Sequence, residues 1–174
     1  MLTSPIVAPS KSLNSLLEAG SLEQLQEISQ SYSQEEWQAI LDYVRLEQAK
    51  QGSTPHYIEY VFEPLLEDGQ GFLPPHIHQL IEFVEGCIRD RKNGVALLPR
   101  GSSKSTSVTT GWLSEFIAKN PHIRIGLISN TDTQAWAFSG AIRSVHESNE
   151  RFYDIYGDCV SRKKWTDAEW FHKA

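Results

Sequence analysis

The sequence is poor in cysteine and has no long apolar run. Its two cysteines, Cys87 and Cys159, form no C-x-x-C pair and no zinc-binding pattern, which fits an intracellular, reducing setting. No apolar stretch approaches the ~20 residues that a membrane span needs, and the opening residues, MLTSPIVAPS, lack the basic start of a secretion signal. We therefore expect a soluble protein that is neither exported nor inserted in a membrane.

Positive charge is scarce in the first part of the chain. Residues 1–70 hold three Lys and Arg against 11 Asp and Glu, whereas residues 71–174 hold 13 against 11. The acidic part is a poor surface for nucleic acid, while the second part can lie near a polyanion. A length of 174 residues with 40% hydrophobic residues is enough for a folded core.

The acidic part has the pattern of helices. Ser33-x-x-Glu36 has the form of a capping box, in which side chains and backbone donors at a helix start satisfy one another. Behind it comes one apolar stripe at helical spacing, made of Trp37, Ile40, Leu41 and Val44. Residues 51–55, "QGSTP", then break the pattern. Residues 1–70 are accordingly predicted to be an N-terminal helical section.

The rest of the chain alternates between strand and helix patterns. An amphipathic helix is expected after Pro74-Pro75, followed by a short strand at 95–98, "VALL". The next helix ends near Asn120-Pro121, and residues 123–129, "IRIGLIS", are the second strand candidate. Thr131-x-x-Gln134 then starts a further helix. Strand, helix and strand over ~35 residues match a βαβ unit, so the pattern predicts an α/β fold with a parallel sheet.

The stretch "LLPRGSSKSTSV", residues 97–108, stands where the first strand would lead into a helix. It nearly fits the phosphate-binding pattern G-x-x-x-x-G-K-[ST], with Lys104-Ser105 in place. The N-terminus of a helix attracts anions, and Arg100 adds a second cation. Ser103 stands where the pattern has glycine, and a left-handed backbone there would cost a serine ~1 kcal/mol. A variant nucleotide site, an inactive one and an ordinary strand-to-helix turn all fit these residues.

The same stretch resembles the "PRG-x-GKST" loop of bacteriophage terminase large subunits, the ATP-driven motors that pump DNA into proheads. "GFLPPHIHQLIEFV" before the loop and "IGLISNTDTQAWAFSGAIRSVHESNERFYDIYGD" after it are similar to the family's neighbouring segments, as is "KKWTDAEW" further on. The likeness covers roughly residues 72–170, and its specificity lies in the combination of these pieces.

The resemblance implies a fold, a cofactor and a set of site residues. Residues 71–174 would be the front part of a P-loop NTPase-type domain with a parallel sheet core, following the helical section at 1–70. Lys104 would hold the phosphates of ATP, Ser105 would bind Mg²⁺, and Arg100 would act on the γ-phosphate. Gln79 is the candidate for the adenine contact, with His76 and His78 as rivals. The nucleotide-binding loop would consist of Gly101, Ser102, Ser103, Lys104, Ser105 and Thr106.

Two departures from the family limit the activity that we expect. Ser103 replaces the family's usual glycine, and no apolar run after residue 129 ends in the acidic pair of a Walker B strand. We therefore expect the front part of a packaging ATPase, one that binds ATP but hydrolyses it negligibly alone.

The family also implies partners for such a chain. They would be double-stranded phage DNA, the portal, the small terminase subunit and further copies in a ring, in the host cytoplasm. The alternatives are a truncated, non-catalytic packaging-associated protein and a fragment of another P-loop ATPase such as a helicase.

Overall fold

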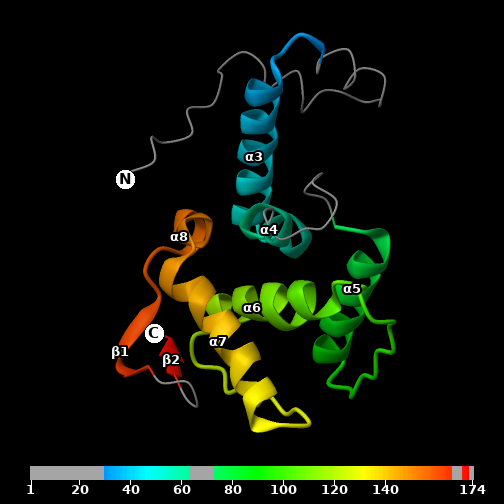
Figure 1. Ribbon diagram of the computed structural model, residues 1–174, viewed down its shortest axis with the longest axis vertical. Coiled ribbons are helices and arrows are strands. Elements are labelled where there is room, and N and C mark those ends of the chain that lie inside the picture. Colours follow the sequence, from blue (N-terminus) through cyan, green and yellow to red (C-terminus); the bar gives the residue numbers. More distant parts are fainter. Residues whose placement is uncertain (1–29, 63–72, 166–169, 173–174) are drawn as a thin grey trace.

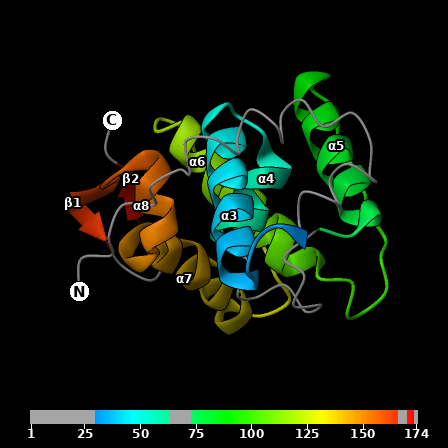
Figure 2. The ribbon, with the colours of Figure 1, turned by 90° about the horizontal axis from the view of Figure 1, so that it is seen from above.

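The structure, a computed structural model, describes residues 30–62, 73–165 and 170–172, and this part of the chain is mostly helical. Figures 1 and 2 both place α4 and α6 between α5 on one side and α7 and α8 on the other, and Figure 1 shows α3 standing out from the body. The helices are α3 (Gln34–Lys50), α4 (Thr54–Val61), α5 (Pro75–Arg89), the π-helix η2 (Ser105–Trp112), α6 (Leu113–Lys119), α7 (Asp132–Ser148) and α8 (Glu150–Tyr156).

The prediction of an α/β fold with a parallel P-loop sheet is wrong. Neither 95–98 nor 123–129 is a strand, and the sheet of the described residues has only two strands, which pair antiparallel. They are β1 (Val160–Trp165) and β2 (Trp170–His172), with Val160 opposite His172 and an irregular register between the two ends.

The two segments remain loops because nothing in the described chain completes a sheet around them. A strand is held by backbone hydrogen bonds to a neighbouring strand, and no such bond forms at either segment within the described residues. Parallel strands are also buried on both faces. Here Leu98 and Leu127 pack against the helical core, while Leu97 and Ile128 are 93% and 98% exposed.

The predicted helix starts are confirmed at two capping sites. At α3 the backbone N–H of Ser33 donates to Glu36 Oε2 at 2.9 Å, and the N–H of Glu36 donates to Ser33 Oγ at 3.2 Å. These hydrogen bonds hold the pKa of Glu36 below its usual value. At α7 the side chain of Thr131 accepts from the N–H of Gln134 at 3.3 Å. Both caps use residues within one helical turn, so the local sequence is sufficient to specify them.

Helix α5 leads into the loop that carries the predicted site. It begins at Pro75, where proline's missing N–H is tolerated, and ends at Arg89. Beyond it, Arg91 has a left-handed backbone with φ of 54°, and the N–H of Lys92 donates to the carbonyl of Cys87 at 2.8 Å. This is the Schellman form of helix ending, and it reverses the chain toward residues 94–104.

One hydrophobic core joins the helices from both predicted sections. It buries Tyr57 and Ile58 of α4 together with Ile77 of α5, and its further members include Trp112, Leu113, Ile142, Val145 and Phe152. The predicted boundary between residues 70 and 71 lies outside the described residues, as do 166–169 of the last predicted element. None of the helices in the described ranges has the length and apolar character to cross a membrane.

Candidate phosphate-binding loop

The predicted loop turns sharply before a helix. Gly101 has φ of 77° and Ser103 has φ of 52°, so two of three consecutive residues have the left-handed backbone that favours glycine. At Lys104 the backbone becomes helical, and the N–H of Ser107 donates to the carbonyl of Ser103 at 2.9 Å. The turn therefore ends in the first residues of η2. For Ser103 this conformation costs roughly 1–2 kcal/mol relative to a right-handed backbone.

The start of η2 has the groups that bind anions. The first N–H groups of a helix have no partner within it, and the helix dipole makes this end positive. Ser105 and Thr106 supply hydroxyls here, both half-buried. Ser102 Oγ is shielded from solvent and has no hydrogen-bond partner among the residues that the structure describes. The loop thus presents backbone and side-chain donors that a phosphate could use.

Two cations flank the loop in different settings. The ammonium of Lys104 folds back over the turn and donates to the carbonyl of Pro99 at 3.2 Å. Arg100 is exposed, and no ion pair within the described ranges involves its guanidinium. Lys104 already lies across the loop, and a stronger acceptor such as a phosphate oxygen could replace the Pro99 carbonyl.

The three candidates for the adenine contact lie on α5, and the structure separates them. His76 Nε2 lies 3.3 Å from the carbonyl oxygen of Ser102, so this histidine touches the loop. His78 instead faces Glu59, with 4.0 Å between Nε2 and Oε1. Gln79 is exposed on the same helix and contacts no loop residue through a hydrogen bond in the described structure. Of the three, His76 is the one that the fold brings to the predicted site.

The metal role predicted for Ser105 depends on a single hydroxyl. Over 30–62, 73–165 and 170–172, no group of three or more His, Cys, Asp or Glu side chains is arranged to hold a metal ion. No hydrogen bond or ion pair within these ranges connects residues 100–106 to a carboxylate. The residues present suit a Mg²⁺ that arrives with its phosphates, since such an ion keeps several waters and needs few protein ligands.

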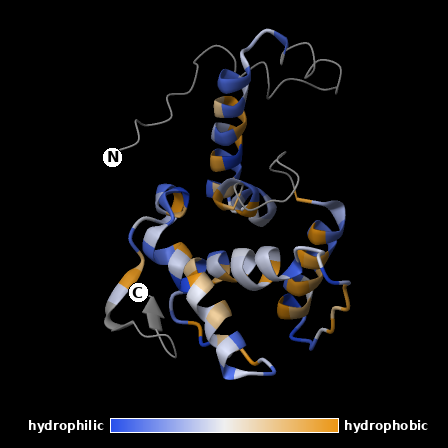
Figure 3. Ribbon diagram, in the orientation of Figure 1, coloured by the Kyte–Doolittle hydropathy of each residue, from blue (hydrophilic) through white to orange (hydrophobic). Residues whose placement is uncertain are grey.

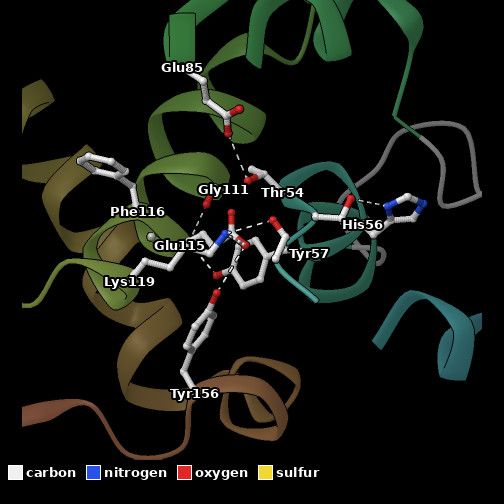
Figure 4. A network of polar contacts seen from close by, with 12 residues as sticks. Thr54, His56, Tyr57, Glu85, Gly111, Glu115, Phe116, Lys119 and Tyr156 are labelled. Atoms are coloured by element: carbon white, nitrogen blue, oxygen red, sulfur yellow. Dashed lines mark hydrogen bonds and ion pairs between the residues drawn. The ribbon is translucent and has the colours of Figure 1, made fainter. Parts of the chain in front are cut away.

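The sequence analysis did not predict the polar network around α6, the helix that follows η2 (Figure 4). Glu115 is 1% exposed, and its Oε1 lies 2.8 Å from the ammonium of Lys119 and accepts from the hydroxyl of Tyr156 at 3.3 Å. Burial and the neighbouring Glu115 carboxylate raise the pKa of Tyr156. The sequence signal for this network was Glu115, a charged residue among the apolar residues at 112–117. A charged side chain is almost never fully buried unless it has a partner.

A cavity of about 280 Å³ lies between α4, α5, the end of η2 and α6, and Glu115 and Lys119 are among its lining residues. Trp112 and Phe116, stacked at 4.8 Å between ring centroids, form part of its lining. None of the predicted site residues lines it. The candidate site is therefore the surface loop and not this cavity.

Comparisons of the chain with family models, curated proteins and solved structures give no match.

Proposed function

We propose that the chain binds the triphosphate of Mg·ATP at Gly101–Thr106, as the ATP-binding front part of a motor that moves double-stranded DNA into viral proheads. The observation that carries the proposal is the turn itself. Gly101 and Ser103 bend the backbone directly before a helix that begins with Lys104-Ser105-Thr106. Phosphate binding of this kind needs a helix N-terminus and a cation, and neither depends on a parallel sheet.

Each loop residue has a specific task in this proposal. The backbone N–H groups at the start of η2 and the Lys104 ammonium hold the phosphates. Ser105 holds Mg²⁺ through its hydroxyl, and the ion, when bound, offsets part of the phosphate charge. The exposed guanidinium of Arg100 is available to the terminal phosphate. His76 contacts the loop and orients its Ser102 peptide.

Binding without turnover is the expected behaviour of this chain alone. Hydrolysis needs a group that orients or deprotonates the attacking water, commonly a carboxylate. No carboxylate bonds to residues 100–106 within the described part of the chain. By the terminase resemblance, the motor would act with portal, small subunit and further copies, and the chain itself contributes nucleotide binding.

A titration with a fluorescent ATP analogue and Mg²⁺ tests the proposal. Lys104→Ala should raise the dissociation constant at least tenfold, because a charge-assisted hydrogen bond to phosphate contributes ~1.5–3 kcal/mol. Lys50→Ala is the matched control, since Lys50 is an exposed lysine on α3 whose ion pair in the described part of the chain is with Glu47. Equal binding by the wild type and Lys104→Ala, or no binding by the wild type, would contradict the proposal.

A further inference from the structure

The cavity between α4, α5, the end of η2 and α6 has a buried floor and an exposed rim. Thr54 of α4 and Trp112 of η2 line it and are 6% and 7% exposed, whereas Ile88 of α5, which also lines it, is 46% exposed. Figure 3 shows apolar residues along α5, the helix that carries the rim. A small molecule can therefore enter past α5 and lie against side chains that have little other contact with solvent.

The floor of the cavity is aromatic. Trp112 and Phe116, one helical turn apart, stack with 4.8 Å between their ring centroids and an angle of 17° between their planes. Flat rings pack well against such a surface, and the faces of aromatic rings also attract cations. The volume of the cavity is about 280 Å³. Since an apolar cavity of about 150 Å³ takes up benzene, this one has room for a compound of one or two rings.

Both basic side chains that line the cavity already have a carboxylate partner. The ammonium of Lys119 lies 2.8 Å from Glu115 Oε1, and it also donates to the carbonyl of Gly52 at 3.3 Å. Arg89 Nε lies 3.7 Å from Asp90 Oδ1. The buried charge of Glu115 is thus compensated by Lys119 within the protein, and neither residue of this pair needs a ligand.

Glu85 is the lining carboxylate that has no ion pair among the residues the structure describes. Its Oε1 accepts from the hydroxyl of Thr54 at 3.2 Å, as Figure 4 shows. This hydrogen bond connects α5 to α4 and holds the carboxylate at the wall of the cavity. A cationic group on a bound molecule would give Glu85 an ion pair beside the aromatic floor, where the ring faces also favour positive charge.

We propose that this cavity is a binding site for a small aromatic amine. The one or two rings of the ligand pack against Trp112 and Phe116, and its ammonium pairs with Glu85. None of residues 100–106 lines the cavity, so the site is separate from the proposed phosphate-binding loop.

Isothermal titration calorimetry at pH 7 with three indole compounds tests this assignment. Tryptamine carries an ammonium, indole is uncharged, and indole-3-propionate carries a carboxylate on the same ring. The wild type should bind tryptamine with a dissociation constant of about 1 mM or lower, at least about threefold more tightly than the other two. Tighter binding of the acid would overturn the proposal, because it would assign the preference to Arg89, whose partner Asp90 also pairs with Lys92.

Three substitutions separate the contribution of charge from that of shape. Glu85→Gln keeps an acceptor for Thr54 but removes the charge, so it should weaken tryptamine binding at least about threefold and change indole binding by less than about twofold. Glu82→Gln is the matched control, because Glu82 is another exposed glutamate of α5 and does not line the cavity, and it should change neither affinity. Phe116→Leu should weaken both compounds about equally, since it removes ring surface.

Several results would overturn the proposal. They are no binding of tryptamine by the wild type, equal affinity for tryptamine and indole, and Glu85→Gln binding that is unchanged or reduced equally for both compounds. Unchanged binding by Phe116→Leu would exclude the aromatic floor as the contact and overturn it as well. Mg·ATP should not displace tryptamine, and displacement would place the compound in the nucleotide site instead. Circular dichroism verifies that each variant keeps its helices.

Discussion

Replacing Ser114 by alanine should destabilise the protein more than replacing its partner Tyr57 by phenylalanine. Tyr57 Oη lies 2.8 Å from Ser114 Oγ, and both side chains are fully buried where α4 meets α6. Ser114 also donates to the carbonyl of Gly111, again at 2.8 Å. A serine hydroxyl has one proton, so Tyr57 must be the donor in the first bond. Figure 4 labels Tyr57 and Gly111 in the polar network that includes this contact.

The two substitutions leave different groups unpaired. Tyr57→Phe removes the donor and should cost ~1 kcal/mol, the usual net value of one hydrogen bond. Ser114→Ala removes two hydrogen bonds and leaves a buried phenol without an acceptor, which should cost ~2–4 kcal/mol. Burial already raises the pKa of Tyr57 well above its usual range, so ionisation cannot relieve the phenol. Adding Tyr57→Phe to Ser114→Ala should therefore cost almost nothing, since it removes the orphaned group.

Urea unfolding, followed by circular dichroism at pH 7, measures these differences in the free energy of unfolding. Ser144→Ala, an exposed serine on α7, is the control and should stay within ~0.5 kcal/mol of the wild type. The reasoning is refuted if Tyr57→Phe costs as much as Ser114→Ala. It is refuted equally if the double variant shows the sum of the two single effects, because the coupling between the groups would then be zero.

Three further predictions follow from the loop and from the half-buried His56. Gly101→Ala should destabilise the fold by ~0.5–1.5 kcal/mol, because its φ of 77° disfavours a side chain although no atom lies within 4 Å of the added Cβ. Gly140→Ala, within α7 and equally unobstructed, should instead stabilise by up to ~1 kcal/mol, and thermal melts of the pair must show opposite signs. Ser103→Gly should change the free energy of unfolding by less than ~1 kcal/mol. Glycine removes the backbone strain at φ of 52°, but it also raises the conformational entropy of the unfolded chain, and the two effects largely cancel. A larger loss in urea unfolding would show that the serine side chain stabilises the turn. Burial lowers the pKa of His56 below its ordinary 6.5, although the charge of Glu59 acts in the opposite direction. The unfolded chain therefore binds more protons than the folded one, and the free energy of unfolding should fall as pH drops through 6.5. His56→Gln should reduce that slope in urea unfolding between pH 8 and 5.5, and an unchanged slope would exclude His56 as its source.

The helices could be predicted because their determinants are local. Ser33 and Glu36 form a complete capping box within four residues, and at α7 the Thr131 side chain accepts from the N–H of Gln134. The proline pair at 74–75 marked the start of α5 correctly. At the two caps one turn of sequence contains both partners of the hydrogen bond, and at α5 proline's own geometry favours a helix start, so no knowledge of the fold is needed.

The sheet could not be predicted because a strand depends on residues far away in the sequence. The patterns at 95–98 and 123–129 are those of strands, yet in the described structure no neighbour pairs with either. The strands that do form, β1 and β2, lie in a region whose basic residues gave no strand signal. Strand propensity describes a side chain that suits a half-buried surface, and it does not supply the second strand.

The candidate site divides in the same way between local and distant determinants. The turn at Gly101 and Ser103 and the helix start at Lys104 are adjacent in sequence, and they keep their geometry without a parallel sheet around them. The contact of His76 with the loop comes from another helix, and sequence reasoning preferred Gln79. Under the proposed function, phosphate binding would use the local set, whereas hydrolysis would need a carboxylate supplied from elsewhere. The two proposed steps therefore have separate structural requirements, and among the described residues no carboxylate bonds to the loop to serve hydrolysis.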